Sequence, residues 1–228
     1  MRITPEEVTA LLLSVKVALF SLVVMFPLGL LVGWILAKRD FPGKSVINTI
    51  VMLPLVLPPV VSGYLLLILL SRNGPIGGIL YDLFKIEIVF SQFAVVIAVS
   101  IISFPLLVRG IMTGIASVPS ELEDTARTLG ATPIRVFFTV TLPLAKQGII
   151  AGVILGFAKS LGEFGATLMV AGNIPGKTQT LALSIFSAVQ LGQDITVYRL
   201  VFISTILAFI AIWITEKFQS TSISKILN

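Results

Sequence analysis

Long apolar stretches separated by short polar segments dominate the chain. Five of them reach the roughly 20 residues that a helix needs to cross a bilayer, and they lie near residues 8–37, 45–71, 89–112, 141–170 and 196–217. Two shorter apolar pieces, 76–84 and 180–192, predict short helices at the surface, although a sixth span at 180–192 stays open. The pattern predicts an all-α integral membrane protein with about five to six transmembrane helices.

The composition supports this class and excludes several kinds of chemistry. Of the 228 residues, 56% are hydrophobic and 12% are charged, and the mean hydropathy is +1.06. The chain has no cysteine and no histidine, which excludes disulfides, thiolate or imidazole metal sites and Ser-His nucleophiles. The net charge of +5 is spread between apolar segments, so we expect membrane lipid around the chain and no nucleic-acid partner.

The basic residues predict an orientation in the membrane. The short loop after the first stretch holds Lys38, Arg39 and Lys44, and such loops are cytoplasmic by the positive-inside rule. Alternating from this loop places the amino terminus outside and residues 113–140 and the carboxyl terminus inside. The predicted inner segments hold nine basic residues: Lys38, Arg39, Lys44, Arg109, Arg127, Arg135, Lys146, Lys217 and Lys225.

Residues 120–136 predict two helices that meet at a sharp corner. Ser120 followed by Glu123 matches a capping box, and Gly130 suits the left-handed conformation that ends a helix. Thr132 and Pro133 then predict the start of a second helix.

The first of these two helices is amphipathic. Leu122, Ala126 and Leu129 share one face of it. An interfacial helix on lipid headgroups is one interpretation, but such helices favour basic polar faces. This helix carries three acidic residues and one basic residue, which favours a protein partner: Glu121, Glu123, Asp124 and Arg127.

The same segment resembles the cytoplasmic loop of ABC-importer permeases. That loop has an acidic residue, two small residues, three variable residues and Gly, followed after nine residues by an aliphatic residue, any residue, Leu and Pro. Asp124 stands where the family usually has Glu, and Thr125 where it usually has Ala, while Glu123 offers a second carboxylate for the acidic position. The matching residues are Asp124, Thr125, Ala126, Gly130, Val140, Leu142 and Pro143.

The resemblance implies a type I ABC importer permease fold, with residues 1–228 as one transmembrane domain and a coupling-helix loop at about 117–135. The helix is expected to insert into a cleft on an ATP-hydrolysing subunit, with charged residues at the rim and apolar residues buried. The residues expected to couple are Glu121, Leu122, Glu123, Asp124, Ala126, Arg127, Leu129 and Gly130. Further implied partners are a second permease copy, two ATPase copies that carry ATP and Mg²⁺, and an extracytoplasmic binding protein. No cofactor is expected on this chain.

Two other segments resemble the permeases of molybdate importers, and more distantly those for sulfate and tungstate. They are residues 53–67, with a double proline followed by Gly-Tyr, and residues 157–181. The double-proline segment favours molybdate or tungstate over sulfate.

The fourth apolar stretch carries an ionisable pair and regularly spaced glycines. Lys159 and Glu163 lie four residues apart, so they share a helix face where a charge is costly unless it is paired or hydrated. Either they line a pathway for an oxyanion, together with Ser160 and Gly162, or they neutralise each other and fix the packing. The glycines Gly148, Gly152 and Gly156 predict close helix packing.

Two other classes of function are less consistent with the sequence. An ion-coupled secondary transporter predicts inverted repeats with matching ionisable residues, which the first half lacks beyond Lys16. An intramembrane enzyme needs paired carboxylates, a metal cluster or an activated nucleophile. The sequence has no GxxxxGK[ST] phosphate-binding loop, so we expect another chain to hydrolyse ATP.

Overall fold

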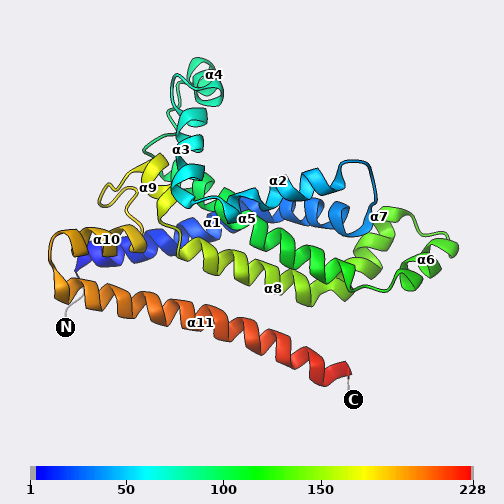
Figure 1. Cartoon of the computed structure of the whole chain (residues 1–228). Helices are drawn as coiled ribbons and strands as arrows, with labels where there is room; N and C mark the ends of the chain where they lie inside the picture. The colour runs from blue at the N-terminus through cyan, green and yellow to red at the C-terminus, as the bar shows by residue number, and fades with distance from the viewer. Residues whose placement is uncertain (1–3, 227–228) are drawn as a thin grey trace.

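The computed structural model is built from helices and describes the backbone of residues 4–226 and the side chains of residues 4–213 (Figure 1). Lys217 and Lys225, counted above for the orientation, lie outside the described side chains. The elements are α1 Pro5–Lys38, α2 Lys44–Val56, α3 Pro59–Leu70, α4 Pro75–Phe84, α5 Gln92–Ala116, α6 Ser120–Thr128, α7 Pro133–Val136, a π-helix Phe137–Thr141, α8 Leu142–Leu161, α9 Gly165–Ala171, α10 Leu181–Gln190 and α11 Asp194–Ile226.

Four runs of helix in the described chain are long and apolar enough to cross a membrane, namely Pro5–Lys38, Gln92–Ala116, Pro133–Leu161 and Asp194–Trp213. The predicted span at 45–71 is present in broken form, because α2 and α3 meet at an angle of 110°. The bend lies at Pro58, whose extended backbone precedes Pro59 at the first helical position of α3. Counted as one broken span, this pair gives the fifth.

The predicted span at 141–170 is also interrupted. Helix starts earlier, at Pro133, runs through the π-helix and α8, and stops at Leu161. Gly162 caps α8, and a second short helix, α9, resumes at Gly165. A hydropathy pattern averages over such a break, so residues 141–170 read as one apolar stretch although the backbone turns inside it.

The two short apolar pieces form ten-residue helices, α4 and α10, as predicted. A helix of this length covers about 15 Å, about half of the hydrocarbon core. α4 is largely exposed apart from Gly77, whereas α10 buries Leu181, Leu183 and Ala188, so the surface position predicted for both fits α4 better. Ser14 on α1 accepts a hydrogen bond from the Leu181 N–H at the start of α10.

α5 forms the centre of the bundle and packs closely against α8. A Cβ built on Gly110 would lie 2.3 Å from the Cα of Gly152, and one on Gly114 would lie 2.8 Å from the Cα of Gly148. Only glycine fits at such a crossing, so the predicted role of Gly148 and Gly152 in close packing is confirmed. Buried side chains such as Leu107 and Ile111 fill the space around the contact.

The two ends of the bundle carry different elements. α6 and α7 lie at one end, while the amino terminus and α10 lie at the other (Figure 1). At the amino-terminal end, the buried Glu7 carboxylate forms an ion pair with Arg199, which fastens α1 to α11. The segment that resembles a coupling loop is therefore an outer corner of the structure.

Candidate functional site

α6 begins without the predicted capping box, and that prediction is wrong. Pro119 takes the capping position and Ser120 is already the first helical residue. In the described structure no side chain caps this end of the helix. The Glu123 side chain, which a capping box needs at the start of the helix, turns instead towards the inside of the bundle.

The corner after α6 has the predicted chemistry. Gly130 has φ +86°, and its N–H donates to the Arg127 carbonyl while the Ala131 N–H donates to the Ala126 carbonyl. The Thr132 hydroxyl then caps α7 by accepting from the Arg135 N–H, and Pro133 is its first residue. Both predictions are confirmed, so α6 ends sharply and the chain turns straight into the next helical run.

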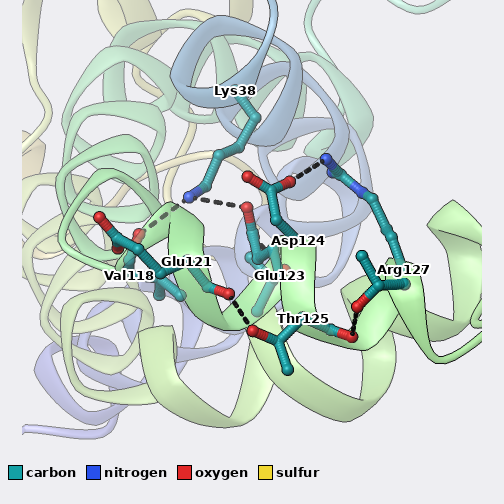
Figure 2. Close-up of polar contacts among 9 residues, drawn as sticks. Lys38, Val118, Glu121, Glu123, Asp124, Thr125 and Arg127 are labelled. Carbon is teal, nitrogen blue, oxygen red and sulfur yellow. Dashed lines mark hydrogen bonds and ion pairs between the residues drawn. The ribbon is translucent and has the colours of Figure 1, made fainter.

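Glu123 is anchored inside the chain (Figure 2), and no sequence pattern indicates its partners. Its side chain is 6% exposed, and its Oε2 lies 3.1 Å from the Lys38 Nζ at the end of α1. Its Oε1 accepts a hydrogen bond from the Thr141 hydroxyl of the π-helix, while Lys38 also donates to the Val118 carbonyl at 3.0 Å. The pair therefore ties α6 to α1 and to the helical run that leads into α8.

The neighbouring charges on α6 point outward, as expected of a partner-binding rim. Arg127 Nη1 donates to Asp124 Oδ1 at 2.9 Å, and both side chains are more than half exposed (Figure 2). Glu121 is also exposed. The structure thus separates the carboxylates that sequence reasoning grouped together, since Glu123 lies inside and Asp124 lies outside.

The apolar stripe of α6 is only partly covered by the rest of the chain. Leu129 is 83% exposed and Leu122 is 48% exposed, while Ala126 is half-buried. Exposed leucines beside an exposed ion pair form a small amphipathic surface.

The second predicted cluster lies at the break between α8 and α9. Lys159 Nζ is 3.0 Å from Glu163 Oε2, so the two charges form a pair. The other carboxylate oxygen, Oε1, accepts from the Ala166 N–H at the start of α9. Glu163 is buried, whereas the Lys159 side chain is 30% exposed.

The other two residues of this cluster face different surroundings. The Ser160 hydroxyl is buried and lies 3.0 Å from the Ser103 hydroxyl and 2.7 Å from the Gly156 carbonyl. A Cβ built on Gly162 would meet no atom within 4 Å. Lys159 and Gly162 therefore adjoin open space, while Ser160 and Glu163 hold the break in place.

The two broken spans meet at their breaks. A Cβ on Gly165 of α9 would lie 3.0 Å from the Pro59 Cβ of α3, and one on Gly63 would lie 2.6 Å from the Ala166 Cα. Non-helical backbone at membrane depth is tolerated where protein covers it or where it lines a cavity. Here each short helix covers the other, which explains why both breaks persist.

Comparisons with known proteins relate the whole architecture to transport. The family model for the binding-protein-dependent transport system inner membrane component matches residues 25–221. The molybdenum transport system permease protein ModB of Escherichia coli (strain K12) is 46% identical over 217 residues, which cover 95% of this chain and 95% of the relative. ModB of Haemophilus influenzae is 44% identical over 218 residues, covering 93% of this chain and 95% of the relative.

Solved structures share the fold at low identity. A bacterial ABC transporter involved in the import of alginate aligns with a TM-score of 0.71 at 15% identity, covering 94% of this chain and 80% of the other. The MetNI methionine ABC transporter, in inward-facing form, aligns with a TM-score of 0.64 at 15% identity, covering 92% and 91%. The chain therefore has the predicted all-α fold of type I ABC importer permeases.

We predict that removing one member of the Lys38–Glu123 pair destabilises the protein. Lys38→Met leaves a buried carboxylate without its cation, which costs about 3 kcal/mol of unfolding free energy. The double variant Lys38→Met/Glu123→Gln recovers most of this loss because neither charge remains. Thermal unfolding of the purified protein in detergent measures the effect.

The exposed pair beside it is the matched control. Asp124→Asn breaks the ion pair with Arg127 in contact with water, where such a pair contributes less than about 1 kcal/mol. Equal losses of stability in Lys38→Met and Asp124→Asn would show that Glu123 is not an internal anchor.

Proposed function

Since the chain belongs to the family of binding-protein-dependent transport system inner membrane components, we propose that it is the permease subunit of an ATP-driven importer whose cargo is molybdate. The assignment of molybdate as the cargo rests on the 44% and 46% identity to two molybdenum transport permeases over more than nine tenths of the chain. The chain is a multi-pass protein of the inner membrane. In the proposed orientation its amino terminus faces outward, and α6 and the carboxyl terminus face the cytoplasm.

The proposed assembly contains two copies of this chain and two copies of an ABC ATPase, with an extracytoplasmic molybdate-binding protein outside. ATP and Mg²⁺ are bound by the ATPase subunits, and this chain binds no cofactor of its own. ATP binding draws the ATPases together and opens the pathway outward, and hydrolysis reverses the movement. The chain thus works by alternating access and hydrolyses nothing itself.

α6 suits the transmission step because it is rigidly held. A short helix of nine residues is marginal alone in water, so tertiary contacts have to fix it. Glu123 supplies such a contact through Lys38 and Thr141, while Leu129 and the Asp124–Arg127 pair stay available on the outer surface. A displacement of α6 by a bound partner is therefore transmitted to α1 through Lys38 and to the start of α8 through Thr141.

Lys159 is the residue proposed to meet the oxyanion. The Lys159 side chain is partly exposed and Gly162, three residues on, adjoins open space, while Glu163 is buried and holds the start of α9. A lysine half-neutralised by its neighbour attracts a dianion only weakly. Weak attraction suits a passage that has to release its cargo, and the binding protein then provides the selectivity.

We predict that Gly130→Pro disconnects the permease from its ATPase. Proline has φ near −65° and no N–H, so it fits neither the φ of +86° nor the bond from Gly130 to Arg127. The altered corner displaces the outer face of α6, and we expect the chain to insert into the membrane without retaining the ATPase. Co-purification of the two subunits measures this.

Gly192→Pro is the matched control for that variant. Gly192 also has a positive φ, +66°, and donates its N–H to a carbonyl in the preceding turn, that of Val189. It lies between α10 and α11, at the opposite end from α6. Full ATP-dependent uptake by Gly130→Pro would contradict the role assigned to α6.

We predict that Lys159→Met/Glu163→Gln lowers uptake while the complex stays assembled. The double variant keeps the break neutral but removes the ammonium, whose attraction for a dianion through water corresponds to about a fivefold change in rate. Lys146→Met, an exposed lysine elsewhere on α8, is the control. Unchanged uptake by the double variant would assign the pair to packing only.

The cargo is tested by ATP-dependent uptake of labelled molybdate into vesicles that hold this chain, its ATPase and its binding protein. We expect excess sulfate to leave uptake intact, and competition by tungstate would show that the two anions share the route. The sulfate transport system permease protein CysT of Salmonella typhimurium is 37% identical over 186 residues, covering 82% of this chain and 67% of the relative. Loss of uptake with excess sulfate would therefore favour the sulfate branch.

A further inference from the structure

A cavity of about 210 Å³ lies between the end of α1 and the corner formed by α6 and α7. Trp34, Lys38 and Arg39 line it from α1 and the residue that follows, and Glu123 and Arg127 line it from α6. Phe137 of the π-helix closes one side. Three basic side chains and one acidic side chain thus surround a space large enough for a phosphate group.

The charges in this cavity are not fully balanced. Lys38 is paired with Glu123, and Arg127 with Asp124. Asp40, next in the chain, hydrogen-bonds Lys44 at 2.9 Å, and this bond and the lysine charge lower the pKa of its carboxyl. Among the side chains that the structure describes, no carboxylate forms an ion pair with Arg39.

The surroundings of Arg39 place the cavity at the edge of the membrane. One apolar run ends at Lys38 and another begins at Pro133, so both helices reach their polar ends here. The Arg39 guanidinium lies 5.7 Å from the centre of the Trp34 ring, and tryptophan is typical of the membrane–water boundary.

The helical run that starts at Pro133 also carries exposed apolar side chains that are not part of the cavity lining. Ile134 is 72% exposed and Phe138 is 59% exposed. They follow Pro133, which itself lines the cavity. The same helical run therefore contributes both to the cationic cavity and to exposed apolar surface.

We propose that this cavity binds the headgroup phosphate of an anionic phospholipid, with Arg39 as the main cation. Basic pockets between transmembrane helices at the membrane surface are suited to acidic headgroups. Trp34 in the cavity, with the exposed Ile134 and Phe138 on the helical run that starts at Pro133, offers the acyl chains apolar surface, which an acidic side chain from a water-soluble partner does not need. The proposal goes beyond the transport function and does not depend on it.

The position of the cavity gives the lipid a consequence for α6. Lys38 lines the cavity and at the same time holds Glu123, so a bound phosphate shares the lysine that anchors α6. The lipid therefore forms part of the same polar cluster that fixes this helix against α1.

The chain offers a direct optical test, because it has two tryptophans and Trp34 is one of them. In the Trp213→Phe variant, all tryptophan fluorescence comes from Trp34. The full chain is placed in phosphatidylcholine nanodiscs to which a minor fraction of a brominated lipid is added. This brominated lipid is phosphatidylglycerol in one sample and phosphatidylcholine in the other. We expect brominated phosphatidylglycerol to quench Trp34 with about fivefold higher apparent affinity, the factor that corresponds to one basic side chain at the membrane surface.

Three variants make the test specific to the cavity. Arg39→Gln should abolish the preference, and Arg39→Lys should keep most of it. Arg135→Gln, which removes the same charge from exposed α7 outside the cavity, should leave it unchanged. Equal quenching by the two lipids, or a preference that survives Arg39→Gln, would overturn the proposal and leave the cavity to an acidic group of a partner protein.

Discussion

Inside a bilayer, each peptide group and each charge has to find its partner within protein or water, and this constraint shapes the whole chain. The ionisable residues that point inward come in pairs, such as Glu7 with Arg199 and Lys159 with Glu163. Irregular backbone at Pro58 and Gly162 occurs where α3 and α9 cover each other. The breaks and the buried charges thus reflect one requirement, which is that a buried charge or an irregular stretch of backbone is held by another part of the protein.

Within that constraint, α6 uses adjacent carboxylates for different tasks. Successive residues of a helix differ in direction by about 100°, so Glu123 and Asp124 face different surroundings. Glu123 joins Lys38 and Thr141 inside, and Asp124 joins Arg127 outside. One face of α6 is therefore bound to the rest of the chain, and another face is exposed to a partner. A single rigid helix thus connects the surface to the interior.

Local signals in the sequence predicted local structure well. The turn at Gly130, the start at Thr132 and Pro133, and the three membrane helices predicted at 8–37, 89–112 and 196–217 follow from backbone preferences and hydropathy, and all are present. The Glu123 anchor could not be predicted, because Lys38 and Thr141 are distant in the chain and nothing local marks them as partners. The predicted capping box is absent for the same reason, because Glu123 forms a buried ion pair with the distant Lys38 in place of a local hydrogen bond. The breaks at Pro58 and Gly162 were missed because hydropathy measures polarity and not backbone direction.

The π-helix Phe137–Thr141 sets the rotational phase between α6 and the rest of the bundle. A widened turn holds an extra residue compared with an α-helix, and it brings Thr141 to Glu123 while α8, beginning at Leu142, still presents Gly148 and Gly152 to α5. Loss of one residue here would keep the helix continuous but rotate one of these faces by about 100° relative to the other. The number of residues between Gly130 and Gly148 is therefore as much a constraint on this chain as their identity.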